Sequence, residues 1–114
     1  MSGITTHILD TSKGKPASGV FVRLEYFSDE QEWHELGRGE TDADGRLKNL
    51  LPADKEIAPG EYRLTFEVGD YFSQQSVESF YKQVIVSFVI HDSSQHYHVP
   101  LLLNPFGYST YRGS

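Results

Sequence analysis

The last stretch of the chain, from His96 to Ser114, concentrates side chains that can do chemistry. It contains two histidines two residues apart, three tyrosines and an arginine close to the chain end. Histidine can exchange a proton near neutral pH, and arginine offers a planar fork of donors that suits paired oxygen acceptors. Chain ends are usually polar and mobile. A chain end of this composition therefore indicates a segment that is held in place, and we interpret it as part of an active site.

Two further candidates lie far from this stretch in the sequence. His7 falls within an alternating β-branched segment, residues 4–9, and projects from the face opposite the isoleucines. Arg46 directly follows the Asp-Gly pair of DADGR, a strong turn signal because Gly45 tolerates a positive φ. By spacing alone, a strand histidine is more often structural than catalytic, and Arg46 more often a surface residue. Their role is open at this point.

Metal binding is an alternative use of these residues. His96 and His98 share one face of a strand, as a pair of ligands would. The chain has no cysteine and that face carries no carboxylate, so the usual ligand sets are incomplete. DADG resembles the start of a calcium loop, but Ala53 stands where the bidentate glutamate is required. We expect no metal and no cofactor, and we assign His34 and His91, in loop-like contexts, to solvent.

Length and composition bound the remaining possibilities. The 114 residues, 38% hydrophobic and 13% aromatic, suit one domain over residues 1–114 with a single core. A net charge of −6 without long runs of one sign disfavours nucleic acid as a partner. No apolar run approaches the roughly 18 residues of a membrane span, so no membrane partner is expected. We expect a cytoplasmic protein, or a periplasmic one if a leader was removed.

The candidate site residues must be positioned by short segments in which apolar and polar residues alternate, with turn residues between the segments. Seven or eight such segments predict an all-β sandwich of two sheets. The segments are residues 4–9, 20–27, 33–41, 47–51, 61–68, 84–90, 96–103 and 108–112. The segment 84–90 is apolar on both faces, which predicts a central strand buried on two sides. One short helix is predicted near residues 73–80, where Val77, Phe80 and Tyr81 follow helical spacing.

Several motifs together resemble a known family. The opening THILDT with GKPA, the central TDADGR and the closing HVPLLL, FGY and STYRGS are similar to the transthyretin-related family, specifically its 5-hydroxyisourate hydrolase branch. The resemblance spans nearly the whole chain. The terminal YRGS is its specific part, because within this fold it separates the hydrolases from the hormone carriers. Lys82 and Asn104 depart from the common proline and serine, both at junctions between elements.

The resemblance implies a transthyretin-like (prealbumin-like) sandwich and a cofactor-free hydrolase of purine (urate) catabolism. The implied reaction converts 5-hydroxyisourate to 2-oxo-4-hydroxy-4-carboxy-5-ureidoimidazoline. Opening a cyclic amide with water needs a base, a proton donor for the departing nitrogen and a cation for the oxyanion. The implied catalytic residues are His98 as base, His7 as its partner, and Arg46 on the oxyanion; the two histidine roles could be exchanged. The implied substrate-binding residues are Tyr111, Arg112 and Ser114.

The resemblance also implies a homotetramer, a dimer of dimers with sites in the channel between dimers. Two other functions remain as alternatives. A transthyretin-type carrier of small molecules would share the fold and the tetramer. A channel lined by His7, Arg46, His98 and Arg112, however, is too polar for an iodinated aromatic hormone. An accessory β-sandwich without a site predicts nothing in particular at the terminus, so YRGS counts against it.

Overall fold

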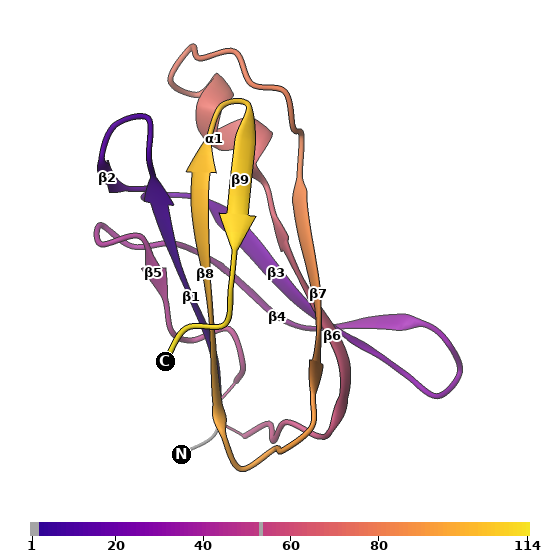
Figure 1. Cartoon of the computed structure of the whole chain (residues 1–114). Coiled ribbons are helices and arrows are strands. Elements are labelled where there is room, and N and C mark those ends of the chain that lie inside the picture. Colours follow the sequence, from indigo (N-terminus) through magenta and orange to yellow (C-terminus); the bar gives the residue numbers. More distant parts are fainter. Residues whose placement is uncertain (1–2, 53) are drawn as a thin grey trace.

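Two β-sheets packed face to face make up the chain, together with one short helix (Figure 1). The computed structural model describes residues 3–52 and 54–114. Its strands are β1 (Gly3–Asp10), β2 (Lys15–Pro16), β3 (Phe21–Phe27), β4 (Trp33–Glu40), β5 (Arg46–Leu47), β6 (Gly60–Phe66), β7 (Val84–Ile90), β8 (His96–Asn104) and β9 (Gly107–Thr110). The predicted all-β sandwich is confirmed. Within the described residues, no helix has the length and apolar character needed to cross a membrane.

The two sheets differ in how their strands meet. One sheet has the order β2-β1-β8-β9, with β5 also paired to β1, and the other has the order β4-β3-β6-β7. β1 and β8 run parallel, whereas every other pairing is antiparallel. The parallel pair joins opposite ends of the chain. It therefore places the strand of His7 directly beside the strand of His96 and His98.

Alternate side chains of these strands fill the space between the sheets. In β1, Ile4 and Ile8 are buried while His7 lies on the other face, as its alternation predicts. In β8, Tyr97 and Val99 are buried while His98 lies on the other face. The core is continuous across both sheets. The histidines thus occupy the outer face of the first sheet, away from the core.

The helix and three strands differ from the prediction in their bounds. The helix α1 spans Val68–Ser73 rather than a segment near residues 73–80. Its buried residues are Val68, Tyr71 and Phe72, which have the helical spacing that we assigned to a later triad. In that later segment Phe80 is 72% exposed. Because Val68 begins the helix, β6 ends at Phe66, and β5 and β9 are likewise shorter than predicted.

The prediction that residues 84–90 form a central strand buried on two sides is wrong for β7. Among the described strands it pairs only with β6, and it lies at the edge of its sheet, not at its centre. Val84 and Ile90 are buried, but Ile85 and Val89 are 51% and 53% exposed on the outer face. Apolar side chains on both faces of a strand show that both faces are suited to burial. They do not show that residues of the same chain bury both faces. The outer face of β7 is left open in the single chain.

Candidate active site

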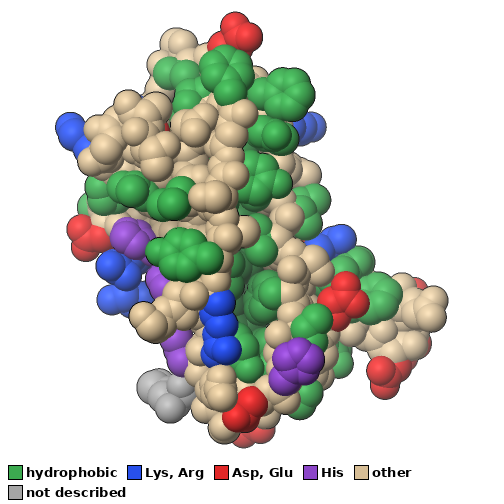
Figure 2. Space-filling view, viewed as in Figure 1, with side chains coloured by type: hydrophobic (Ala, Val, Ile, Leu, Met, Phe, Trp, Pro, Cys, Tyr) green, Lys and Arg blue, Asp and Glu red, His purple; other side chains and the backbone are tan. Residues whose placement is uncertain are grey.

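Four segments of the first sheet lie side by side at the candidate site. β5 pairs with β1 so that Arg46 is opposite His7, and β1 pairs with β8 so that Thr5 is opposite His98. Beyond β9, Gly113 forms an isolated bridge to His98. Residues from the beginning, middle and end of the sequence therefore meet on one face. Figure 2 shows histidine side chains next to lysine and arginine on this side of the molecule, over β1 and β5.

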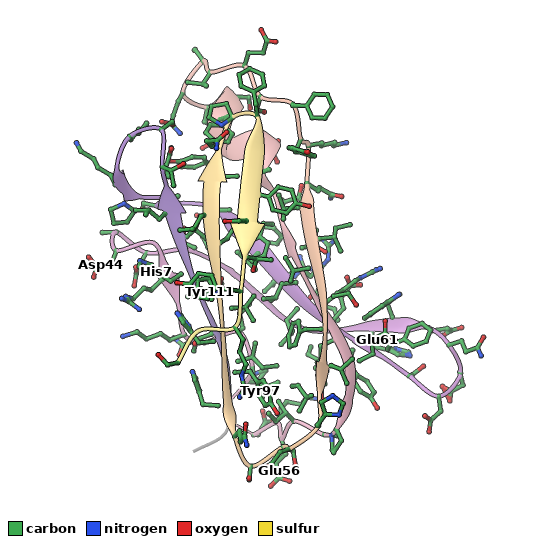
Figure 3. All side chains as sticks on the ribbon, viewed as in Figure 1. His7, Asp44, Glu56, Glu61, Tyr97 and Tyr111 are labelled. Carbon is green, nitrogen blue, oxygen red and sulfur yellow. The ribbon has the colours of Figure 1, made fainter. Side chains whose placement is uncertain are left out.

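A cavity of about 470 Å³ opens at this meeting point. We call it the histidine cavity, and it is lined by Thr5, Thr6, Arg46, Lys48, His96, His98 and Ser114. The structure thus brings together three of the predicted site residues, Arg46, His98 and Ser114. His7 does not line the cavity itself but stands beside it in β1, paired with Arg46 and labelled in Figure 3.

The turn before Arg46 is held by its own side chains. Asp42 Oδ1 accepts hydrogen bonds from the backbone N–H groups of Asp44 and Arg46, at 2.9 and 3.0 Å. These bonds, above all the one from Arg46, keep the pKa of the Asp42 carboxyl below its usual value. Gly45 has a φ of +73°, which confirms the predicted Asp-Gly turn. In the described part of the chain, no group of three or more potential metal-binding side chains is found here or elsewhere.

The surroundings of His98 favour its neutral form. Burial of the ring is the main cause that lowers the pKa of His98, and the positive charges of Arg46, His7 and His96 lower it further. A neutral imidazole keeps a lone pair on one ring nitrogen and can therefore accept a proton. Among the candidate side chains, His98 is thus suited to act as a base near neutral pH.

This environment makes a measurable prediction for the titration of His98. We expect its midpoint, followed by NMR, to lie below the ordinary value of 6.5, because burial and nearby cations oppose protonation. Replacing Arg46 with glutamine removes one of those cations and should move the midpoint upward. The matched control is Arg38→Gln, whose guanidinium binds Glu35 in the other sheet and should leave His98 unchanged. A midpoint at or above 6.5 in the unchanged protein would contradict the argument.

Thr5 is a site residue that the sequence reasoning missed. Its hydroxyl oxygen lies 2.8 Å from Nδ1 of His98 and 2.9 Å from Nε2 of His96. Thr5 could have been identified from the sequence, because it stands two residues before His7 and therefore lies on the same face of β1. His96, which we weighed only as a metal ligand, is joined to His98 through this hydroxyl.

The chain end lies directly against His98. The backbone N–H of Gly113 donates to the carbonyl oxygen of His98 at 2.8 Å, and Ser114 lines the histidine cavity. A side chain at position 113 would place its Cβ 2.7 Å from Cδ2 of His98 and 3.1 Å from Pro100. Glycine is therefore required for the chain end to approach His98 this closely.

We expect Gly113→Ala to lower kcat by roughly 10- to 100-fold, because the new methyl group must displace the His98 ring or the chain end, and small misplacements cost this much. The matched control is Gly107→Ala in β9, where the nearest atoms to a new Cβ are 3.7 Å away. Steady-state kinetics with circular dichroism would measure both variants. Equal kcat values for the two alanine variants would show that contact with His98 is unimportant.

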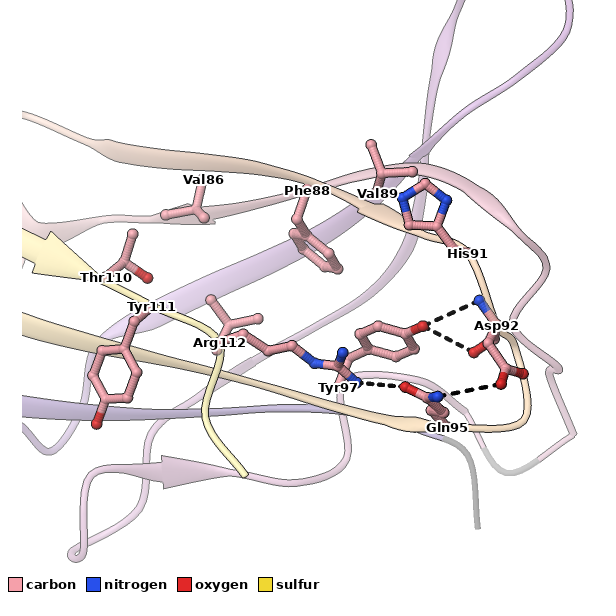
Figure 4. A pocket seen from close by; sticks show the side chains of 11 residues that line it. Val86, Phe88, Val89, His91, Asp92, Gln95, Tyr97, Thr110, Tyr111 and Arg112 are labelled. Atoms are coloured by element: carbon pink, nitrogen blue, oxygen red, sulfur yellow. Dashed lines mark hydrogen bonds between the residues drawn. The ribbon is translucent and has the colours of Figure 1, made fainter.

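Tyr111 and Arg112 lie elsewhere in the single chain. Arg112 Nη2 donates to Gln95 Oε1 at 2.8 Å, and the guanidinium lies 4.3 Å from the centre of the Tyr97 ring. Both residues line a second cavity of about 510 Å³, together with Phe88 and other side chains of β7 (Figure 4). Here Arg112 anchors the chain end to β8. A direct role for Tyr111 and Arg112 in substrate binding stays a prediction.

The remaining histidines lie apart from this cavity. His91 follows β7 and lines the second cavity, and its side chain is exposed. His34 is exposed as expected, although it lies within β4 and not in a loop.

The chain is similar to known proteins over nearly all of its length. The model of the HIUase/Transthyretin family matches residues 4–113. A 5-hydroxyisourate hydrolase of Salmonella dublin is 50% identical over 111 residues, which cover 97% of this chain and 80% of that protein. The structure of Klebsiella pneumoniae 5-hydroxyisourate hydrolase is 38% identical, with a TM-score of 0.86 and all of both chains covered. The structure of sea bream transthyretin in complex with thyroxine is 32% identical, with a TM-score of 0.90, and 96% and 93% of the two chains are covered.

Proposed function

The chain belongs to the HIUase/Transthyretin family and is a hydrolase of 5-hydroxyisourate, and we propose that the histidine cavity is the place of the reaction. The observation that carries this assignment is the meeting of Arg46, His98 and Ser114 around one cavity, with His7 paired to Arg46. The product is 2-oxo-4-hydroxy-4-carboxy-5-ureidoimidazoline, in which a ring amide has been opened by water.

The proposed reaction begins with His98. Its Nε2 takes a proton from a water molecule, whose oxygen then bonds to the carbonyl carbon of the ring amide. Arg46 stabilises the negative charge that develops on the carbonyl oxygen, because its guanidinium is always cationic and presents several donors. His7 supplies a proton to the ring nitrogen as the C–N bond breaks, which leaves a carboxylic acid and a ureido group. The acid then ionises to the carboxylate and its proton returns to His7, while His98 releases to solvent the proton that it took from water. The lowered pKa of His98 supports its role as the proton acceptor.

The fold by itself does not separate this function from a carrier function. The sea bream protein, solved with thyroxine, is as similar in shape as the Klebsiella hydrolase. The difference lies in the side chains of the site. Two cations, Arg46 and Lys48, and two histidines line the histidine cavity. This lining suits a flat, oxygen-rich ring better than a large apolar one.

The direct test is the decay of freshly made 5-hydroxyisourate, followed by absorbance. The substrate decays unaided, so the rate without protein must be subtracted. We expect the intact chain to accelerate the decay at catalytic concentrations. A lack of acceleration, combined with tight binding of thyroxine, would favour the carrier function.

We also propose a homotetramer, in which the histidine cavity faces a second dimer. The exposed apolar residues at the sheet edges support association: Ile85, Val89, Phe106, Tyr108 and Tyr111. Figure 2 shows hydrophobic side chains along much of the side of the molecule that carries β7, β8 and β9. β7 and β9 each pair on one side only within the described chain, and edge strands of this kind readily pair with another molecule.

Light scattering during gel filtration should give four times the 12.9 kDa of one chain. A fully active monomer would contradict a site that needs the tetramer.

A further inference from the structure

Thr5, His96 and His98 form a hydrogen-bonded chain at the wall of the histidine cavity. The parallel register of β1 and β8 sets Thr5 opposite His98, so that its hydroxyl reaches both rings. Its oxygen lies 2.8 Å from His98 Nδ1 and 2.9 Å from His96 Nε2. The ring nitrogen of His98 that remains for the cavity is Nε2.

The chemistry of a hydroxyl group restricts where the protons lie. A threonine hydroxyl has one hydrogen to donate and two lone pairs to accept with. It cannot donate to both histidines, so at least one of the two ring nitrogens facing it must carry a hydrogen. If His98 is to accept a proton at Nε2, its own hydrogen must sit on Nδ1, because a neutral imidazole carries only one.

We propose that Thr5 is a positioning residue that holds the hydrogen of neutral His98 on Nδ1, and that His96 completes the arrangement by accepting the hydroxyl hydrogen at Nε2. In this arrangement the Nδ1–H of His98 donates a hydrogen bond to the Thr5 oxygen, and the Thr5 hydroxyl donates one to Nε2 of His96. This leaves the lone pair of His98 Nε2 available for the attacking water. The inference rests on the proposed function of His98 as the base.

The charges around His98 agree with this arrangement. The charged or titratable groups around it are Arg46 from β5, Lys48 just after β5, His7 from β1 and His96 from its own strand. The two permanent cations, Arg46 and Lys48, favour a lone pair, and not an N–H, on the nitrogen left for the cavity. Among the residues that the structure describes, Thr5 is the only hydrogen-bond partner of His98 Nδ1, so no other group there would hold the hydrogen on that nitrogen.

A pair of substitutions separates the hydroxyl from the shape of the side chain. Thr5→Val keeps the branched shape and removes the hydroxyl, whereas Thr5→Ser keeps the hydroxyl. We expect Thr5→Val to lower kcat by about 10- to 100-fold, by analogy with the loss of the hydrogen bond that fixes the tautomer of a metal-bound histidine. Thr5→Ser should recover most of that loss. Equal losses in the two variants would show that packing, and not the hydroxyl, matters, and would overturn the proposal.

The tautomer can be read without any turnover, from the ¹⁵N shifts of the His98 ring in the free protein. We expect the Nδ1–H form in the unchanged protein and a larger share of the Nε2–H form in Thr5→Val. Because this reading needs no substrate, it decides the role of Thr5 even if the intact chain fails to hydrolyse 5-hydroxyisourate.

A substitution at exposed His96 covers the case in which Thr5→Val does not fold. His96→Phe removes the acceptor and should also raise the Nε2–H share, whereas His34→Phe, at an exposed histidine in the other sheet, should not. An unchanged His98 tautomer in whichever of Thr5→Val and His96→Phe folds would overturn the proposal.

Discussion

Replacing His98 with alanine is expected to lower kcat by about 10²–10⁴-fold, the usual contribution of a general base. The ring lines the histidine cavity, and its surroundings keep it neutral near pH 7. In the proposed mechanism, removing it leaves the attacking water without a proton acceptor, while Arg46 remains in place for the substrate. The loss should therefore fall on kcat more than on KM, as measured by steady-state decay of 5-hydroxyisourate.

The sandwich should remain folded in this variant. The side chain of His98 is on the outer face of β8, and the hydrogen bond from Gly113 goes to its backbone oxygen, which alanine retains. His34→Ala is the matched control, since that histidine is exposed in β4 on the other sheet. A folded His98→Ala protein with unchanged kcat would remove His98 from the mechanism.

Deleting residues 111–114 is expected to abolish measurable activity and to leave a folded sandwich. The deletion removes Ser114 from the histidine cavity and the Gly113 bond to His98. β9 ends at Thr110, and the side chains of Tyr111 and Arg112 are exposed in the single chain. Loss of the chain end therefore opens one wall of the histidine cavity. In the core it removes the Arg112 side chain that lies over the ring of Tyr97.

A shorter deletion separates the two parts of the chain end. Removing only residues 113–114 keeps Tyr111 and the anchoring of Arg112 to Gln95, yet it should lose nearly as much activity. Light scattering on both truncated proteins shows whether assembly survives, and circular dichroism shows whether the fold does. Accelerated decay of 5-hydroxyisourate by the longer deletion would contradict the role given to the chain end.

Much of the fold follows from local patterns. The alternation in residues 4–9 and 96–103 correctly predicted two strands and the outward direction of His7 and His98, because side chains alternate along any extended backbone. The Asp-Gly turn correctly placed Arg46 at the start of a strand. The helix was misplaced because helical spacing occurs twice in succession. Only the copy containing Tyr71 and Phe72 is buried by the rest of the molecule.

The order of the amino acids is enough to show which residues can do the chemistry, which face of its strand each one occupies, and which family the chain resembles. It does not show which side chains become neighbours in space. The parallel pairing of β1 with β8 sets the Thr5 hydroxyl between His96 and His98, and the pairing of β5 with β1 brings Arg46 to His7. The same structure turns Arg112 toward Gln95 and Tyr97. The face of a side chain depends on its own backbone, whereas the choice of partner strand depends on contacts between residues far apart in the sequence.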